Sequence, residues 1–560
     1  MQNDFFVTLL TGQLPFILIV SAVLALPLSG VLLWRYRRAV NRIMSERIGH
    51  NQPGKSHDQY PEPISKIHGD TQVGESRLRL HFVDAKHNPD TGKALWREFS
   101  TLFRRAAGIH LLAGFMFALI MALAYVISGI DEIVMMQIVV MGYIFFWPAV
   151  LVFNLLTTTV STRVILYIVG YFIIFLIING IVLIRNPHMG SVDLFIVWAT
   201  YNLPPTLLLM AFMNQRIRAV GPMVWVFMFA AITGSLFVLG VTGASDLLLG
   251  FFIQLGEVTS LDTSGIFIGI LLVGFVIFSG IGWMLLGFVR RAYESRVVSD
   301  QSLAVDSVIL IFALYYAINL VFEGLVWFLS GLIAFAVFVF TVRLGMKYAA
   351  VSSFVARPLL VLRVFSLGKK SEALFKAISQ RWRYMGHVQL IAGPDLAAAT
   401  IEPHEFLTFL SGQLRQEFIH DDKTLQQRMA TLETRKDFDG RFRINALFCF
   451  ADTWKQALAA LVGKQNTVLM DLRSFTVRKP GCIHELNTLV SVVPLNRILL
   501  IVDQTTDQEF LSHVLQQAWE QSSNKKNATG SCDAVINVCR IPASVDPADA
   551  LMPWLCGASE

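Results

Sequence analysis

The chain has 560 residues, of which 54% are hydrophobic and only 15% are charged. A soluble protein carries about 25% charged residues, so this composition excludes an ordinary soluble protein. The net charge of +6 is small, and no basic stripe is interleaved with aromatic residues, so we do not expect nucleic acid as a partner. The charges gather in two blocks, roughly 35–105 and 343–560, and apolar runs of membrane-spanning length lie between them.

The first apolar run, residues 14–34, is followed rather than preceded by arginines, at positions 35, 37, 38 and 42. A cleavable signal peptide carries its charge before the apolar run, so we predict a retained transmembrane helix with its amino end outside. Residues 45–78 are polar and aperiodic, and we predict a disordered linker. The scattered histidines there lack ligand spacing, so no metal site is predicted. Residues 92–107 predict an amphipathic helix lying on the inner membrane face.

Six further spans are predicted at 108–128, 134–156, 164–184, 192–213, 221–242 and 264–289. The apolar block 307–342 is too long for one span, and Glu323-Gly324 near its middle predicts two helices joined by a tight turn. This makes about nine spans. With this count the arginines and lysines that flank the spans fall on one side, with Arg185 as the one exception, in agreement with the positive-inside rule. We therefore predict an inner (cell) membrane protein with its amino terminus outside and its C-terminal domain in the cytoplasm.

The predicted spans carry no Asp, Glu, Lys or Arg well inside them, although ion-coupled transporters usually do. Asn154, Asn179 and Asn202 are expected to form hydrogen bonds between helices. Pro204-Pro205 predicts a kink or a break in its span. A transporter with a regulatory domain remains an alternative. The predicted domains are therefore a helix at 1–34, a polar linker at 35–107, a multi-span domain at 108–347 and a cytosolic domain at 348–560.

The C-terminal block alternates apolar strands with helices. The predicted strands are 359–365, 387–391, 467–470, 497–502 and 534–538, and the predicted helices include 371–384, 403–418 and 453–461, with 420–446 a polar segment between them. Continuous apolar strands with intervening helices predict a parallel sheet covered on both faces, in a doubly wound, flavodoxin-like fold. The five cysteines form no CxxC pair, which gives no zinc or redox motif and fits a reducing compartment.

The strand 467–470 ends in Asp471 and Arg473, and a loop then leads to a helix that carries Glu485. In open α/β sheets ligands bind at the carboxyl ends of the strands, so we predict a site that includes these three residues. Each also has a structural interpretation. Glu485 would lie in the first turn of its helix, where the helix dipole stabilises a carboxylate. Asp471 would form a turn at the strand end.

The neighbouring residues are expected to be structural. Cys482 is predicted to be a small buried residue and His484 a surface residue. Asp503 and Asp507 are predicted to shape the loop after the next strand and to cap its helix, which begins with a capping box at 506–509 and reaches Trp519.

The order strand, loop, Gly481-Cys482-x-x-Glu485-Leu486 resembles the catalytic segment of Toll/interleukin-receptor (TIR) domains, although TIR domains usually have Trp where Gly481 stands. It is also similar to the nucleoside 2-deoxyribosyltransferase pattern, in which a strand ends in Asp, here Asp471, before a Gly-x-x-x-Glu-Leu segment. The transmembrane part resembles no family that we can name.

The resemblance implies cleavage of an N-glycosidic bond to ribose. Glu485 would be catalytic, Asp471 would bind a ribose hydroxyl, and Arg473 or Arg363 would hold a phosphate. NAD or a related nucleotide would be a substrate rather than a cofactor, in stress or phage-defence signalling. The resemblance leaves open whether the domain is an enzyme at all. The alternative is a non-catalytic receptor or scaffold that signals by self-association, and in either case we expect a homo-oligomer in the lipid bilayer.

Overall fold

The structure is a computed structural model. It describes residues 2–46, 78–84, 90–129, 135–157, 161–185, 192–212, 220–260, 262–320, 323–349, 357–363, 369–392, 403–450, 453–463, 466–477, 479–524, 534–541 and 547–558. Most of the predicted linker 45–78, with its histidines, lies outside the described residues.

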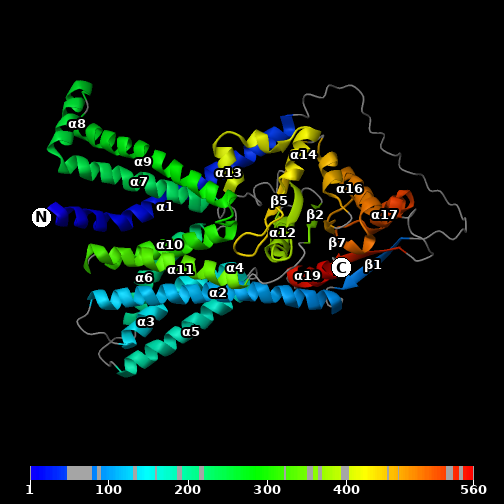
Figure 1. The fold of residues 1–560 in the computed structure, drawn as a ribbon, viewed down its shortest axis with the longest axis horizontal. Coiled ribbons are helices and arrows are strands. Elements are labelled where there is room, and N and C mark those ends of the chain that lie inside the picture. The colour runs from blue at the N-terminus through cyan, green and yellow to red at the C-terminus, as the bar shows by residue number, and fades with distance from the viewer. Residues whose placement is uncertain are drawn as a thin grey trace, which may run out of the picture.

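Two parts make up the molecule, a helical bundle and a parallel sheet with its covering helices (Figure 1). The long bundle helices lie side by side, and the sheet domain sits at one end of them. The amino end of α1 (Gln2–Glu46) lies at the opposite end of the bundle.

The bundle consists of long helices with few interruptions. Besides α1 these are α2 (Asp90–Gly129), α3 (Met135–Phe145), α4 (Trp147–Thr157), α5 (Ser161–Arg185), α6 (Asp193–Phe212), α7 (Gly221–Ala244), α8 (Asp246–Thr259), α9 (Thr263–Glu294), α10 (Asp300–Leu320) and α11 (Leu329–Ala349). Seven helical segments among the described residues are long and apolar enough to cross a membrane, which is compatible with membrane association.

The predicted division of the block 307–342 is confirmed. The chain leaves α10, turns at Gly324, and enters α11 through a short 3-10 helix, Leu325–Phe328. The φ of Gly324 is 142°, a conformation that a residue with a side chain rarely adopts. The two helices then pack closely, because a Cβ on Gly331 would lie only 2.4 Å from the carbonyl oxygen of Ala313.

The helix is interrupted at Phe146, between α3 and α4 and two residues before Pro148, rather than at Pro204-Pro205. The helix α6 runs through both of those prolines without a break. Pro148 has no N–H to donate to the carbonyl oxygen of Ile144, and Nδ2 of Asn202 in α6 donates to that oxygen at 3.2 Å instead. The oxygen Oδ1 of Asn202 accepts a hydrogen bond from the hydroxyl of Tyr316 in α10 at 2.6 Å. The predicted interhelical role of Asn202 is therefore confirmed.

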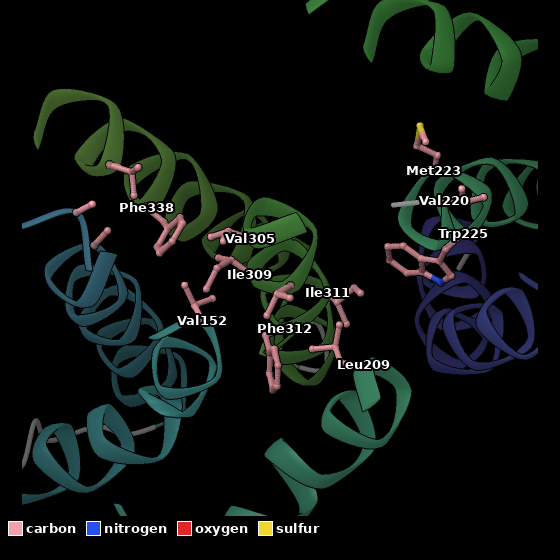
Figure 2. Close-up of a cluster of buried hydrophobic side chains, with 14 of the residues drawn as sticks. Val152, Leu209, Val220, Met223, Trp225, Val305, Ile309, Ile311, Phe312 and Phe338 are labelled. Carbon is pink, nitrogen blue, oxygen red and sulfur yellow. The ribbon is translucent and has the colours of Figure 1, made fainter. Parts of the chain in front are cut away.

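The helix α10 lies in the middle of this part of the bundle. Figure 2 shows its Ile311 pointing toward Leu209 of α6, while Val305 and Ile309 point toward the side where Val152 of α4 and Phe338 of α11 lie. All of these side chains are buried. A movement of α10 would therefore disturb three neighbouring helices at once.

The sheet has eight strands, and every described pair of neighbours is parallel. They are β1 (Leu78–Asp84), β2 (Leu359–Arg363), β3 (Val388–Ala392), β4 (Phe418–Ile419), β5 (Ile444–Cys449), β6 (Thr467–Asp471), β7 (Ile498–Val502) and β8 (Ala534–Arg540). The parallel sheet is confirmed, but the prediction missed β1, β4 and β5. The strand β1 comes from the end of the predicted linker and adds to β8 at one edge, so the α/β domain includes residues far upstream of position 348.

The order of the strands is β1-β8-β7-β6-β2-β3-β5-β4. Without the added β1 and the two-residue β4, the chain order reads 3-2-1-4-5-6, which is the Rossmann arrangement rather than the predicted flavodoxin-like order 2-1-3-4-5. In this arrangement the strand order reverses between β2 and β6, which is the topological switch point where ligands bind.

Helices cover both faces of the sheet. The helices α15 (Trp454–Leu461), α16 (Pro480–Val492) and α17 (Gln508–Gln521) share a buried apolar cluster with one face. On the other face α12 (Lys369–Trp382), α13 (Pro403–Leu410) and α19 (Pro547–Ala558) belong to a cluster that continues into the bundle.

The chain between β3 and β5 is more structured than we predicted. The predicted helix 403–418 ends at Leu410, and β4 and α14 (Asp422–Ala430) follow before β5.

The helix α2 joins the two parts directly. Its 40 residues span about 60 Å, and the predicted boundary at residue 107 falls inside it. The first half was predicted to lie on the membrane, but it packs on the sheet domain instead. Phe99 is buried, Phe103 packs edge-on against Tyr384, and Arg381 lies over the ring of Trp96.

Candidate functional site

The switch point brings two predicted site residues next to each other. Arg363 is the last residue of β2 and Asp471 is the last residue of β6, and the two are direct register partners in adjacent strands. Both side chains are buried. Because all the strands are parallel, this edge of the sheet also receives the loops that follow β6 and β7.

Asp471 and Arg473 form a two-pronged ion pair. Nε of Arg473 donates to Oδ1 at 2.8 Å, and the second nitrogen donates to Oδ2 at 2.7 Å. Burial lowers the pKa of Arg473, but the hydrogen bonds and charge of Asp471 outweigh it, so the net shift is upward. The backbone N–H of Arg473 also donates to Asp471, at 3.2 Å, which confirms the predicted turn-forming role of the aspartate.

Glu485 lies in α16, further from the start of the helix than the sequence suggested. The helix begins at Pro480, so Glu485 falls in its second turn and the expected placement in the first turn is wrong. The dipole effect fades beyond the first turn, and therefore it does not explain this carboxyl group. The side chain is 2% exposed, and Oε2 has no hydrogen-bond partner among the residues that the structure describes.

Burial sets the protonation state of Glu485. It raises the pKa of the carboxyl group to about 8, although the nearby charge of Arg363 acts in the opposite direction. At neutral pH the group is therefore mostly the neutral acid. A neutral acid can donate a proton or a hydrogen bond, whereas stabilising a cationic sugar requires the carboxylate.

Two neighbours of Glu485 serve the packing of α16. Cys482 is 3% exposed, as predicted, and burial followed by the charge of Glu485 raises the pKa of its thiol to about 12, so it is not a thiolate nucleophile. The ring of His484 is only half-buried and packs edge-on against Trp454, with ring centroids 5.5 Å apart. His484 is thus a packing contact rather than a free surface residue.

The loops after β6 and β7 are tied together, which sequence reasoning missed. Ser474, directly after Arg473, has a φ of 60° and shares a hydrogen bond of 2.8 Å with the hydroxyl of Thr505. The hydroxyl of Thr506 donates to the carbonyl oxygen of Leu472 at 3.0 Å. A non-glycine residue at positive φ is strained, and such strain gathers at functional sites. In the sequence, the one signal for this contact between the two loops was Asp503, the aspartate that follows β7.

The two aspartates of the second loop have the predicted structural roles. Asp503 accepts hydrogen bonds from Thr505 and Thr506, and although its burial acts in the opposite direction, these bonds lower its pKa. Asp507 caps α17 by accepting from the backbone N–H of Phe510 at 3.0 Å. The cap is Asp507 itself, because the hydroxyl of Thr506 is engaged by the neighbouring loop.

This edge of the sheet brings two arginines close to a buried carboxyl group. Arg363 and Arg473 supply guanidinium groups suited to phosphate, and Glu485 supplies a neutral carboxyl group. Among the described residues, no group of three or more His, Cys, Asp or Glu side chains could hold a metal ion. A scan of the chain against family models and searches of curated proteins and of solved structures find no match.

Proposed function

We propose that this chain is a multi-pass membrane protein whose cytoplasmic α/β domain binds a nucleotide at the switch point of its sheet. The observation that carries the proposal is that Arg363 and Asp471 are register partners in adjacent strands. They lie at the two strand ends where the strand order reverses. Rossmann-type sheets bind dinucleotides at this place. Arg363 and Arg473 would contact phosphate, and Asp471 would contact a ribose hydroxyl.

The proposed topology has nine spans, with α1 and α6 added to the seven segments that meet the length and hydropathy limits. The helix ends that meet the sheet domain carry Arg290-Arg291 and Arg343. By the positive-inside rule this end faces the cytoplasm, in an inner (cell) membrane. The amino terminus would then lie outside.

Binding is favoured over cleavage by the state of Glu485. Loss of nicotinamide from NAD leaves positive charge on the sugar, and a neutral acid does not stabilise that charge. The carboxyl group is also 2% exposed, so it does not meet solvent in this conformation. N-glycosidic cleavage of the TIR type is the second candidate. Cleavage requires that a bound nucleotide opens the site around Glu485. It also requires that the charge of Arg363 stabilises the ionised form of Glu485.

The test of binding uses the full chain in lipid nanodiscs, because β1 and the first half of α2 belong to the sheet domain and a fragment starting near residue 350 lacks both. NAD is titrated and its binding is measured by calorimetry. We expect saturable binding that Arg363→Met removes and that Arg540→Met, at the carboxyl end of β8, leaves intact. Equal binding by both variants, or none by the wild type, contradicts the proposal.

The same samples decide between binding and cleavage. Release of nicotinamide from NAD is followed by chromatography, with Glu485→Gln as the site variant and Glu520→Gln, on the exposed face of α17, as its control. Binding without release supports a nucleotide sensor. Release that only Glu485→Gln abolishes supports the glycosidase. The receptor that signals by self-association stays a candidate if binding changes the oligomeric state without turnover.

A further inference from the structure

The bundle contacts the sheet domain at the edge formed by the amino ends of the strands, which is opposite the candidate site. The residues that precede β3 and β5 lie at the amino ends of these strands, and they contact the short connection between α9 and α10. Both nitrogens of the Arg383 fork donate to the carboxylate of Asp300, the first residue of α10, at 2.7 and 2.8 Å. The hydroxyl of Ser299 donates to Asp439 at 2.6 Å.

A second arginine fixes the same connection. Arg443 donates to the carbonyl oxygen of Tyr293 at the end of α9, and its guanidinium lies 3.8 Å from the centroid of the Tyr293 ring. It also pairs with Asp437 at 2.9 Å and with Glu433 at 2.9 Å. The side chain of Arg443 is 1% exposed and that of Asp437 is 0% exposed. Arg443 and Asp437 are thus a buried, hydrogen-bonded ion pair, with the one-third exposed Glu433 beside it, and a buried pair of this kind holds a fixed geometry.

The helix α12 connects the amino edge of the sheet to the candidate site. It starts shortly after β2, whose last residue is the switch-point Arg363, and it ends at Trp382, next to Arg383. Its 14 residues span about 21 Å, from the ligand edge of the sheet to the edge that the bundle holds. A ligand that displaces the start of α12 would therefore displace Arg383.

The helix α10 extends the connection into the bundle. Asp300 is at its amino end, and Tyr316, about 24 Å further along the helix, donates to Asn202. Asn202 in turn satisfies the Ile144 carbonyl oxygen left without its helical partner by Pro148. The interruption between α3 and α4 is thus held by a side chain that α10 positions. Figure 2 shows that α10 also packs toward α6 and toward the side of α4 and α11.

Resting on the proposed nucleotide site, we propose that α12 and α10 form a coupling device that transmits nucleotide binding to the interruption between α3 and α4. The Arg383–Asp300 pair is the joint between the two helices. Binding of a nucleotide at the switch point shifts α12, and the Arg383–Asp300 pair transmits this shift to α10. The movement of α10 alters the Tyr316–Asn202 hydrogen bond. This alteration changes how often the backbone hydrogen bonds around Pro148 open.

The experiment measures hydrogen exchange of residues 143–150 in the full chain in nanodiscs, with and without NAD. Asp300→Asn removes the charge of the joint. The matched control is Asp246→Asn, because Asp246 likewise occupies the first turn of a helix, α8, which lies at the far end of the bundle. We expect NAD to change the exchange of the wild type and the control by about fivefold or more. In Asp300→Asn the change should fall below about twofold, with NAD affinity measured in parallel.

The outcomes separate the two proposals. NAD that binds without altering exchange at 143–150 in the wild type overturns the coupling and leaves the nucleotide site standing. An equal response in Asp300→Asn and the control also overturns it. Absence of NAD binding overturns both proposals. Because Asp300→Asn could weaken folding, Arg383→Lys is measured as well. It keeps the charge but loses the planar fork, and an intermediate response is expected.

Discussion

The two edges of the same sheet are built in opposite ways. At the amino edge Arg383 and Arg443 are buried and paired with carboxylates, and they fasten the domain to the bundle. At the carboxyl edge Glu485 is equally buried, but within the described part of the chain its Oε2 has no hydrogen-bond partner. Leaving a buried polar atom unsatisfied costs about 1–3 kcal/mol, and Nε of Arg441 at the amino edge is likewise without a partner among the described residues. The comparison indicates that the amino edge holds the domain in place, and the proposed ligand site lies at the carboxyl edge.

The largest effect should come from the amino edge. Arg443→Ala leaves the carboxylates of Asp437 and Glu433 without their main partner. Removing one member of a buried pair costs about 3–5 kcal/mol, so the variant should unfold at a markedly lower temperature. Thermal unfolding of the full chain in nanodiscs, followed by circular dichroism, measures the change.

The control for this substitution is Arg428→Ala, because Arg428 pairs with Glu417 while remaining one-third exposed. Surface pairs contribute about 0–1 kcal/mol, so the control should unfold near the wild-type temperature. Equal losses in the two variants would mean that the amino edge is not especially rigid.

A pH dependence should distinguish the carboxyl edge. The pKa of Glu485 is raised from 4.5 to about 8, so the folded chain holds this proton more tightly than the unfolded chain does. The stability that this group contributes is therefore complete below pH 4.5 and is lost as the pH rises to about 8. The loss amounts to as much as about 5 kcal/mol.

Glu485→Gln should remove this part of the pH dependence. Unfolding temperatures of wild type and variant are compared at intervals between pH 5 and pH 8, with Glu520→Gln on exposed α17 as the control. We expect the difference between Glu485→Gln and wild type to grow with pH, in favour of the variant. Parallel curves would show that the carboxyl group is solvated rather than buried.

The sequence predicted the helices and the central strands well, since both depend on local patterns. Residues 497–502 were predicted as a strand, and β7 covers Ile498–Val502. The strand β1 could not be predicted in its place, because its partner β8 is more than 400 residues away in the chain. The same reason hid the roles of the amino-edge arginines. Arg383 was predicted as part of the helix 371–384 and Arg443 as part of a polar segment, and neither pattern pointed to Asp300 or Tyr293 as a partner. Pairing across long sequence separation leaves no local signal.

The site itself was only partly predictable. Asp471 and Arg473 follow a buried strand, and that pattern gave their location. The depth of Glu485 was not visible, because the start of α16 at Pro480 decides which turn carries the carboxyl group. Helix boundaries are the least reliable part of such predictions.

A smaller effect, on ligand binding, should separate the edges further. Arg473→Lys keeps the charge next to Asp471 but loses the planar fork, which holds Asp471 and would contact the phosphate in the proposed site. Hydrogen bonds to charged groups contribute about 1.5–3 kcal/mol, so NAD affinity should fall about tenfold or more. The same substitution at Arg497, just before β7 at the opposite edge, should leave NAD affinity unchanged. Titration calorimetry gives both values, and equal affinities would remove Arg473 from the site.

The smallest effect concerns the loop that closes the carboxyl edge. Asp507→Ala removes the cap of α17, and the loss of a cap costs about 1 kcal/mol. Asp421→Ala removes the cap of α14, which follows β4 at the outer edge of the sheet, far from the switch point. Both variants should lose some thermal stability. Only Asp507→Ala should also weaken NAD binding, because the backbone N–H of Asp507 bonds to the loop that carries Arg473. If both variants bind NAD as the wild type does, the contacts between the loops after β6 and β7 serve folding alone. The proposed ligand site would then include only the strand ends at Arg363 and Asp471.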